Sequence, residues 1–201
     1  KSWTSSENKN GDAFEFISPS TGPTYKEPGN EPAYIEFANN VNQRLYSSEF
    51  DGLSNATEFT RIFVHQPNVN DRDILWGDHQ SGYDGFFHNN NFYFRVNTND
   101  SYQEFVLSGD HKDSIKENLT VQTSTFNDDT NKIKTIFEND ELKTDSGDYE
   151  GEHTGSVEAD KGAYIGVYYD NPTHSWFPYS GKLSDVLIFD RLRRLGGHLF
   201  D

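Results

Sequence analysis

The sequence predicts an all-β protein, a jelly-roll β-sandwich of two antiparallel sheets. About eleven short runs of β-forming residues follow one another along the 201 residues. Many of these runs alternate apolar and polar residues, which is the period of a half-buried strand. The gaps between them contain the Gly, Pro, Asn and Asp residues of tight turns. Short strands at this spacing, separated by turns, are typical of a sandwich or jelly roll.

The expected elements account for most of the chain. Residues 1–12 form a polar lead-in anchored by Trp3, and residues 13–201 form a single domain of a length common among sandwiches. One short helix is expected at residues 111–118. In chain order, the expected strands are residues 13–18, 33–38, 59–65, 73–77, 85–89, 91–97, 102–108, 119–126, 132–139, 163–169 and 182–189.

Alternation predicts which side chains of a strand share a face. In the run NFYFRVN, the apolar residues Phe92, Phe94 and Val96 fall on one face. The run KIKTIFEN is less regular, because Ile133 and Ile136 fall on opposite faces. We therefore expect a β-bulge or a local twist in this second run.

The run KLSDVLIF is the most regular hydrophobic strand of the chain. Gly181 precedes it and allows a close turn. Strict alternation assigns its residues to two faces, with Leu183, Asp185, Leu187 and Phe189 on one and Val186 and Ile188 on the other. Because both faces carry apolar residues, we expect a central strand of the sandwich.

Composition limits the classes of partner. Hydrophobic residues make up only 32% of the chain, but aromatic residues make up 15%, and their large side chains can supply a core. The formal net charge of −16 argues against binding of nucleic acid or anionic membranes through charge. No apolar run has the length of a membrane-spanning helix, so we expect no membrane insertion.

The residues that are missing bear on the location of the protein. The chain has no Cys, which excludes disulfides and thiolate chemistry. It also has no Met and starts at Lys1, which indicates a processed piece of a longer protein from which a signal could have been removed. We expect an extracellular, cell-surface or virion-surface protein.

Acidic loops predict a calcium site. Calcium takes six to eight oxygen ligands from carboxylates, amides and backbone carbonyls. Loops with such groups occur around the four candidate ligands named next and at residues 68–73 and 127–131. None of these loops is an EF-hand. The candidate metal ligands are Asp78, Asp84, Asp145 and Asp148.

Two segments have the composition of a sugar site. Aromatic rings stack on the apolar faces of pyranose rings, while amides and carboxylates bind the hydroxyls. The first segment is WGDHQSGYDGFFHNNN and the second is YYDNPTHSWFPY. The candidate ligand-binding residues are Trp76, Asp78, Tyr83, Tyr168, Asn171, His174 and Trp176. The alternative for the Trp of the second segment is a lid on the core.

Catalysis is less expected than binding. A glycan hydrolase of this fold would carry carboxylates at alternate positions of one strand, where they share a face. Glu49 and Asp51 begin such a motif, but Leu53 and Ser54 stand at the two positions where a third acid would be expected. The acids of DYEGE have the spacing but lie in a Gly-rich loop. Seven scattered His residues show no helical zinc pairing.

The closing segment YSGKLSDVLIFDRLRRL resembles the last strand of concanavalin A-like, laminin-G-type domains. In that family, a glycine precedes an apolar strand that ends in Asp or Asn followed by Arg. The matching residues are Tyr179, Gly181, Leu183, Asp185, Val186, Ile188, Phe189, Asp190, Arg191 and Leu192. The resemblance implies a structural role, local salt bridging, for Asp190 and Arg191.

Earlier segments resemble other strands of the same family, in the family's order. They are AYIEF, EFTRIFVHQP with Phe63 in place of the usual Trp, the paired strands within residues 119–144, and YIGVYYDN. Leu119 replaces a frequent Trp, and Asp140 and Glu141 replace an Asn-Gly turn. The resemblance covers roughly residues 13–195 and implies the concanavalin A-like fold, in which many members hold one calcium between loops.

Three functional hypotheses follow, in order of preference. The first is an extracellular lectin-like domain that binds a glycan or cell-surface polysaccharide, with calcium as a candidate cofactor. The second is a structural or adhesive module that contacts other chains of a larger assembly, such as a virion appendage or bacterial adhesin. The third is a polysaccharide-degrading enzyme, against which the incomplete carboxylate motif counts.

Overall fold

We describe the protein from a computed structural model. The residues that the structure describes are 2–4, 13–16, 22–30, 32–38, 43–47, 53, 55–68, 74–78, 82–87, 91–98, 102–107, 115–116, 118–130, 132–139, 143–145, 149–150, 156, 163–171, 174–176 and 178–189. This part of the chain contains no helix with the length and hydrophobicity needed to cross a bilayer.

The first sheet, sheet A, has eight strands in the order β1-β2-β5-β15-β7-β8-β9-β10, and neighbouring strands pair antiparallel. Its strands are β1 (Ser2–Thr4), β2 (Ala13–Phe16), β5 (Leu45–Ser47), β7 (Ile74–Asp78), β8 (Gly82–Phe87), β9 (Asn91–Asn97), β10 (Tyr102–Leu107) and β15 (Ala163–Ile165). The lead-in therefore contributes a strand, in which Trp3 is paired with Phe14.

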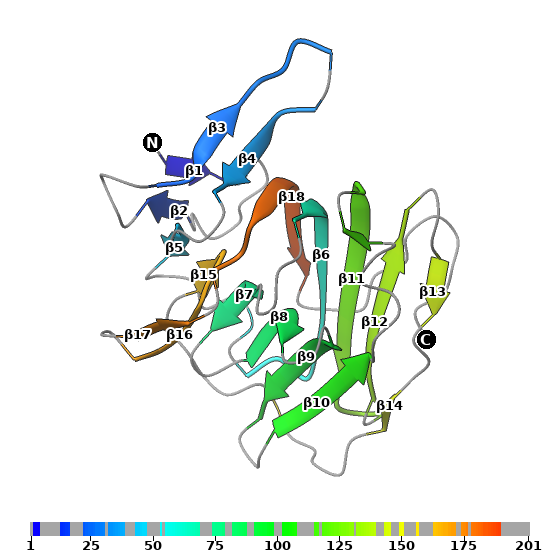
Figure 1. Cartoon of the computed structure of the whole chain (residues 1–201). Helices are drawn as coiled ribbons and strands as arrows, with labels where there is room; N and C mark the ends of the chain where they lie inside the picture. Colours follow the sequence, from blue (N-terminus) through cyan, green and yellow to red (C-terminus); the bar gives the residue numbers. More distant parts are fainter. Residues whose placement is uncertain are drawn as a thin grey trace.

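The second sheet, sheet B, has the order β13-β12-β11-β6-β18-β4-β3, with β14 also paired with β12. Its strands are β3 (Thr24–Lys26), β4 (Tyr34–Phe37), β6 (Glu58–Pro67), β11 (Thr120–Asn127), β12 (Lys132–Glu138), β13 (Lys143–Asp145), β14 (Tyr149–Glu150) and β18 (Gly181–Phe189). A separate hairpin joins β16 (Tyr168–Asn171) to β17 (His174–Trp176). Figure 1 shows β18, β6, β11 and β12 side by side, and the two antiparallel sheets confirm the predicted jelly-roll β-sandwich.

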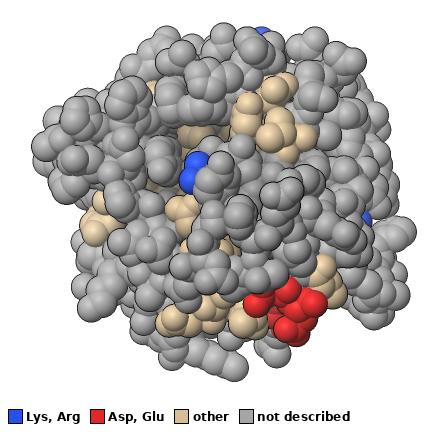
Figure 2. Space-filling model, turned by 90° about the horizontal axis from the view of Figure 1, so that it is seen from below, with Lys and Arg blue, Asp and Glu red and all other residues tan. Residues whose placement is uncertain are grey.

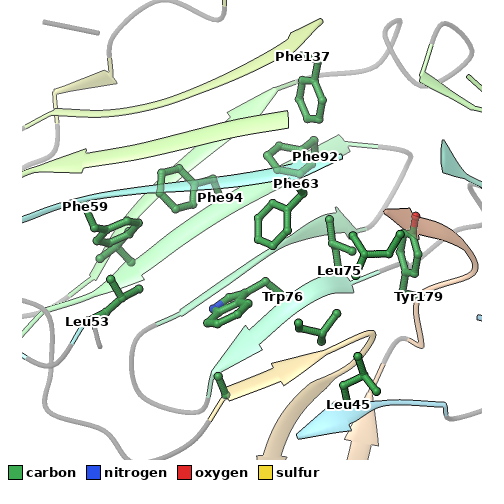
Figure 3. Packing of buried hydrophobic residues seen from close by; sticks show 14 of the residues in the cluster. Leu45, Leu53, Phe59, Phe63, Leu75, Trp76, Phe92, Phe94, Phe137 and Tyr179 are labelled. Atoms are coloured by element: carbon green, nitrogen blue, oxygen red, sulfur yellow. The ribbon is translucent and has the colours of Figure 1, made fainter. Parts of the chain in front are cut away.

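The core between the sheets is rich in aromatic rings, as the composition predicts. Phe92 of sheet A meets Phe137 of sheet B edge to face, with ring centroids 4.8 Å apart. Phe59 and Phe94 make a similar contact at 6.2 Å. Figure 3 shows these rings together between the ribbons. Because each ring buries a large area, the chain builds a core with few aliphatic residues.

Strand β18 corrects one face assignment. The pairing with β6 shifts register between Leu183 and Asp185, so the alternation restarts after the shift. Leu183 is buried in the core, against which Val186 and Ile188 pack, whereas Leu187 is 46% exposed. The prediction that Leu183 shares a face with Asp185 and Leu187 is therefore wrong, because a bulge inverts the faces of the residues that follow it.

The bulge expected in residues 132–139 is absent from the described pairing. Strand β12 pairs with β11 without a break, from Lys132 to Glu138. Ile133 is buried, and Ile136 lies on the other face, where it is half-buried. A regular strand with apolar residues on both faces accounts for this pattern.

Most expected strands are confirmed, and the differences have local causes. The run 163–169 divides into β15 and β16 at Gly166, which has a positive φ of 91°. The short strands β1, β3, β5, β13, β14 and β17 were not expected. In the region of the expected helix, Asn118 N donates to Ile115 O, and most of its other residues lie outside the described part.

Candidate functional site

Trp76 is a core residue. Its side chain is 0% exposed, and its ring lies 6.2 Å from that of Phe63. Figure 3 shows Trp76 among the labelled residues of the core. A buried ring cannot stack on a sugar, so the expectation that Trp76 is a ligand platform is corrected.

Asp84 takes part in a buried polar network between the sheets. Its Oδ2 lies 2.9 Å from Nη2 of Arg61, and both side chains are fully buried. Its other oxygen accepts a 2.9 Å hydrogen bond from Ser124 Oγ. Ser124 Oγ also lies 3.2 Å from the hydroxyl of Thr135 and accepts from Nε2 of Gln122. Because β8 belongs to sheet A and β6, β11 and β12 to sheet B, the network ties the sheets together.

Aromatic rings surround the guanidinium of Arg61. Its Cζ lies 4.8 Å from the ring centroid of Phe59, 5.2 Å from that of Phe94 and 5.6 Å from that of Trp76. Burial raises the pKa of Asp84 and lowers the pKa of Arg61, while the charge of each partner opposes the shift of the other. Asp84 is thus committed to a cation inside the core, which corrects its assignment as a calcium ligand.

Signals for this network were present in the sequence but were not used. Arg61 lies in the apolar run FTRIFVH, two residues after Phe59 and two before Phe63, so alternation places all three on the same face of the strand. A lone charge at an inward position of such a strand predicts a buried partner.

His65 and Tyr179 form a second buried contact, 114 residues apart in the sequence. The hydroxyl of Tyr179 donates to the backbone oxygen of Lys182 at 3.2 Å. Since that donation uses its one proton, Nδ1 of His65 donates to the hydroxyl oxygen at 3.2 Å. Burial lowers the pKa of His65 to about 3, so the ring is neutral near pH 7.

Replacing His65 with glutamine is expected to flatten the acid side of the stability profile. Because the folded-state pKa lies below the ordinary value of 6.5, only the unfolded state takes up this proton as pH falls from about 6.5 towards 3. His65 therefore removes up to about 1.4 kcal/mol of stability per pH unit in this window. Urea denaturation at several pH values measures the difference. Tyr179→Phe is the control and should keep the slope, and equal slopes for wild type and His65→Gln would contradict a buried neutral ring.

The predicted residues of the second segment come together on one hairpin. The register places Tyr168 opposite Trp176 and Asn171 opposite His174. Directly opposed residues are the closest cross-strand neighbours in an antiparallel pair. The backbone thus gathers the candidate residues of this segment, as a binding surface requires.

The first segment lies at the other end of β7. The hairpin leaves the sandwich beside the start of this strand, where Ile74 bridges to Pro178. Asp78 ends the strand opposite Gly82, and Tyr83 lies opposite Gly77. Four residues of extended strand span about 13 Å. The structure therefore does not bring the two predicted segments into one compact site.

The candidate metal ligands are dispersed as well. Asp78 belongs to sheet A, Asp145 lies opposite Ile136 in sheet B, and Asp148 lies outside the described residues. Among the residues with described placement, no three His, Cys, Asp or Glu side chains are close enough to hold a metal ion. Calcium remains a prediction, with Asp84 removed from its ligand set.

An open depression lies where β6 ends and β18 begins, at the upper end of both strands in Figure 1. Its volume is about 550 Å³, within the range of small-ligand sites. One cross-strand row of polar residues runs through it, each member opposite the next. The row consists of Thr24 on β3, Glu36 on β4, Lys182 on β18 and Gln66 on β6.

Hydrogen bonds to backbone groups hold the walls of this depression in place. The buried amide of Gln43 accepts from Ala38 N at 2.6 Å and donates to Gly22 O at 3.1 Å, which ties the end of β4 to the start of β3. Asn68 N donates to Ser180 O at 2.9 Å and joins the ends of β6 and β18.

Gly181 keeps one wall of the depression free of a side chain. Its φ is +141°, and a Cβ there would lie 2.4 Å from the carbonyl oxygen of Gln66. Only glycine fits this conformation without a clash. The glycine that the sequence comparison with laminin-G-type domains singled out thus shapes a depression at the start of the last strand.

The charged residues that line the depression are Glu36 and Lys182, and Lys26 pairs with Glu36. Nζ of Lys26 lies 3.6 Å from Oε2 of Glu36, and both side chains are 45% exposed, so solvent weakens this pair. Nζ of Lys182 lies 5.0 Å from the ring centroid of Tyr34. Among described residues, no carboxylate approaches Nζ of Lys182 within 4.0 Å. Sequence reasoning missed this row because its members lie far apart in the chain and only the strand register brings them together.

No known family model and no curated protein sequence matches the chain. The solved structures that resemble it share its fold at low identity. A heptameric SAP-like pentraxin from Limulus polyphemus has a TM-score of 0.57 and 12% identity, over 81% of this chain and 78% of the pentraxin.

Two further structures are similar to the chain. Tailspike protein 2 of the Escherichia coli O157:H7 bacteriophage CAB120 has a TM-score of 0.60 and 9% identity over 88% of this chain. The binding domain of botulinum neurotoxin serotype D has a TM-score of 0.58 and 10% identity over 91% of this chain. The chain spans 25% of the tailspike and 44% of the neurotoxin chain. At these identities the likeness establishes the β-sandwich fold alone.

Proposed function

We propose that the chain is an extracellular, lectin-like domain that binds a glycan and catalyses no reaction. The observation that carries this proposal is the depression at the start of β18. There, four strands present a hydroxyl, a carboxylate, an ammonium and an amide in one row, with Asn68 and the ring of Tyr34 nearby. Groups that donate and accept hydrogen bonds beside an aromatic ring suit the hydroxyl-rich rim and apolar face of a sugar.

The aromatic hairpin extends this proposed site. Pro178 leads through Tyr179 directly into Ser180 and Gly181, so the chain passes from the hairpin into the depression. We assign sugar contacts to the hairpin residues Tyr168, Asn171, His174 and Trp176. Calcium is a proposed cofactor of the loops near Asp78 and Asp145.

Replacing Trp176 with alanine is expected to abolish or strongly weaken glycan binding without a loss of stability. Removal of an aromatic stacking partner of this kind typically lowers affinity by more than about tenfold. A glycan array with and without a chelator measures binding and also tests calcium. Tyr93→Ala is the matched control, because Tyr93 is a half-buried aromatic residue of β9. This variant should bind glycan as wild type does. Intact binding by Trp176→Ala would remove the hairpin from the site.

The second candidate function is a structural or adhesive module of a larger assembly. The coverage of only 25% of the phage tailspike favours it, since a similar domain there is part of a much longer chain. Absence of binding to every glycan, with and without chelator, would favour this second function. Release of products from polysaccharides by the protein would instead show catalysis and contradict both proposals.

A further inference from the structure

We propose that the depression at the start of β18 selects an acidic sugar, with Lys182 as the group that pairs with the sugar carboxylate. The inference rests on the proposed glycan-binding function and names the class of glycan. Its basis is the arrangement of charge and hydrogen-bonding groups along the row of Thr24, Glu36, Lys182 and Gln66.

The ammonium of Lys182 is available to a ligand. Asp and Glu outnumber Lys and Arg by 33 to 17 in this chain, so a carboxylate would be an ordinary partner for a lysine. Yet no carboxylate of the described residues lies within 4.0 Å of Nζ of Lys182, and the ring centroid of Tyr34 lies 5.0 Å from it. A cation–π contact holds the ammonium in place without neutralising it. An incoming carboxylate therefore meets a positioned positive charge.

The neighbouring carboxylate does not cancel this charge. Glu36 lies opposite Lys182 in the register but pairs with Nζ of Lys26 at 3.6 Å. Glu36 and Lys182 are the charged residues that line the depression, and Glu36 has a second lysine, Lys26, as its ion-pair partner. Figure 2 views the molecule from the opposite end, where described acidic side chains gather in one group. On a chain of net charge −16, a lysine that lines a depression and has no described carboxylate within 4.0 Å of its Nζ favours an anionic ligand.

The remaining groups favour a sugar over a simple anion. Gln66, Asn68 and Thr24 line the depression and carry amides and a hydroxyl, each of which can donate and accept hydrogen bonds. A fully deprotonated anion such as sulfate only accepts hydrogen bonds and would offer no donor to the side-chain oxygens of Asn68 and Thr24. A carboxylate-bearing pyranose satisfies both kinds of group.

Matched pairs of saccharides test this selectivity. Trigalacturonate and its full methyl ester have the same rings and differ in charge, and 3′-sialyllactose and lactose differ by one acidic sugar. Isothermal titration is expected to show tighter binding of the acidic member in at least one pair, by about 10- to 100-fold. The preference should decrease as the salt concentration is raised from about 50 to about 500 mM, because salt screens the attraction between the two charges.

Variants assign the preference to one residue. Lys182→Met is expected to remove the 10- to 100-fold preference, and Lys182→Arg is expected to retain most of it because the charge remains. Lys134→Met is the control, since Lys134 is a half-buried lysine on β12, three strands away from β18 in the same sheet. Circular dichroism verifies that each variant is folded.

The outcomes separate this inference from the proposed function. If neutral glycans bind as tightly as acidic ones, or if Lys182→Met keeps the preference, the inference is wrong and the binding function stands. If none of the saccharides in a wider array binds, the proposed function itself fails. A preference that Lys134→Met removes as well would show a general charge effect and would also contradict the role of Lys182.

Discussion

Replacing Asp84 with alanine is expected to lower the free energy of unfolding by about 3–5 kcal/mol, because it leaves a buried cation without its counter-charge. The guanidinium of Arg61 is fully buried and lies 2.9 Å from the carboxylate that would be removed. Its aromatic neighbours offset only part of the cost of burying a charge. Urea denaturation of wild type and variant measures the effect, with the m-value as a check for two-state unfolding.

A double substitution tests whether the loss comes from the unpaired charge. Arg61→Met combined with Asp84→Leu removes both charges and fills the space with apolar groups, and such replacements are often neutral. We therefore expect the double variant to be more stable than Asp84→Ala. Added calcium should not change the difference in unfolding free energy between wild type and Asp84→Ala. A loss below about 1 kcal/mol, or one that depends on calcium, would contradict the buried network.

Replacing Trp76 with alanine is expected to lower the free energy of unfolding by about 3–5 kcal/mol and to leave glycan affinity of the folded protein unchanged. The indole is 0% exposed and packs beside Phe63 and Arg61, so its removal leaves a cavity between the sheets. Thermal or urea denaturation measures the first effect, and titration below the unfolding transition measures the second.

The other tryptophan of the predicted sugar segments provides the matched comparison. Trp176→Ala should lower affinity and leave stability almost unchanged, which is the reverse of the result expected for Trp76→Ala. If Trp76→Ala were fully stable and failed to bind sugar, the placement of Trp76 in the core would be wrong. The pair of variants thus separates a packing role from a binding role in two segments of similar composition.

Local sequence pattern predicts the strands of this protein well, because alternation and turn residues act over a few positions. The run NFYFRVN becomes β9 with Phe92, Phe94 and Val96 buried. Pattern fails where one residue changes the register, as at the bulge between Leu183 and Asp185. It also fails for short strands such as β3, whose three residues are all exposed and carry no periodic signal.

The site was less predictable than the fold, for two physical reasons. Composition cannot tell an exposed aromatic or acidic residue from a buried one, so Trp76 and Asp84 were expected in a surface site although both lie in the core. Proximity between distant positions depends on strand order, so Glu36 and Lys182 give no common signal in the sequence. By contrast, the hairpin residues Tyr168 and Trp176 are close in sequence, and their pairing follows from a local turn.

The position of β18 in sheet B has a consequence for how the chain reaches its native state. This strand lies between β6 and β4, both of which precede it by more than a hundred residues. Until residues 181–189 leave the ribosome, one edge of β6 has no native neighbour and can pair with the edge of another chain. Folding is therefore expected to be slow, and to benefit from chaperones that shield the open edge of β6.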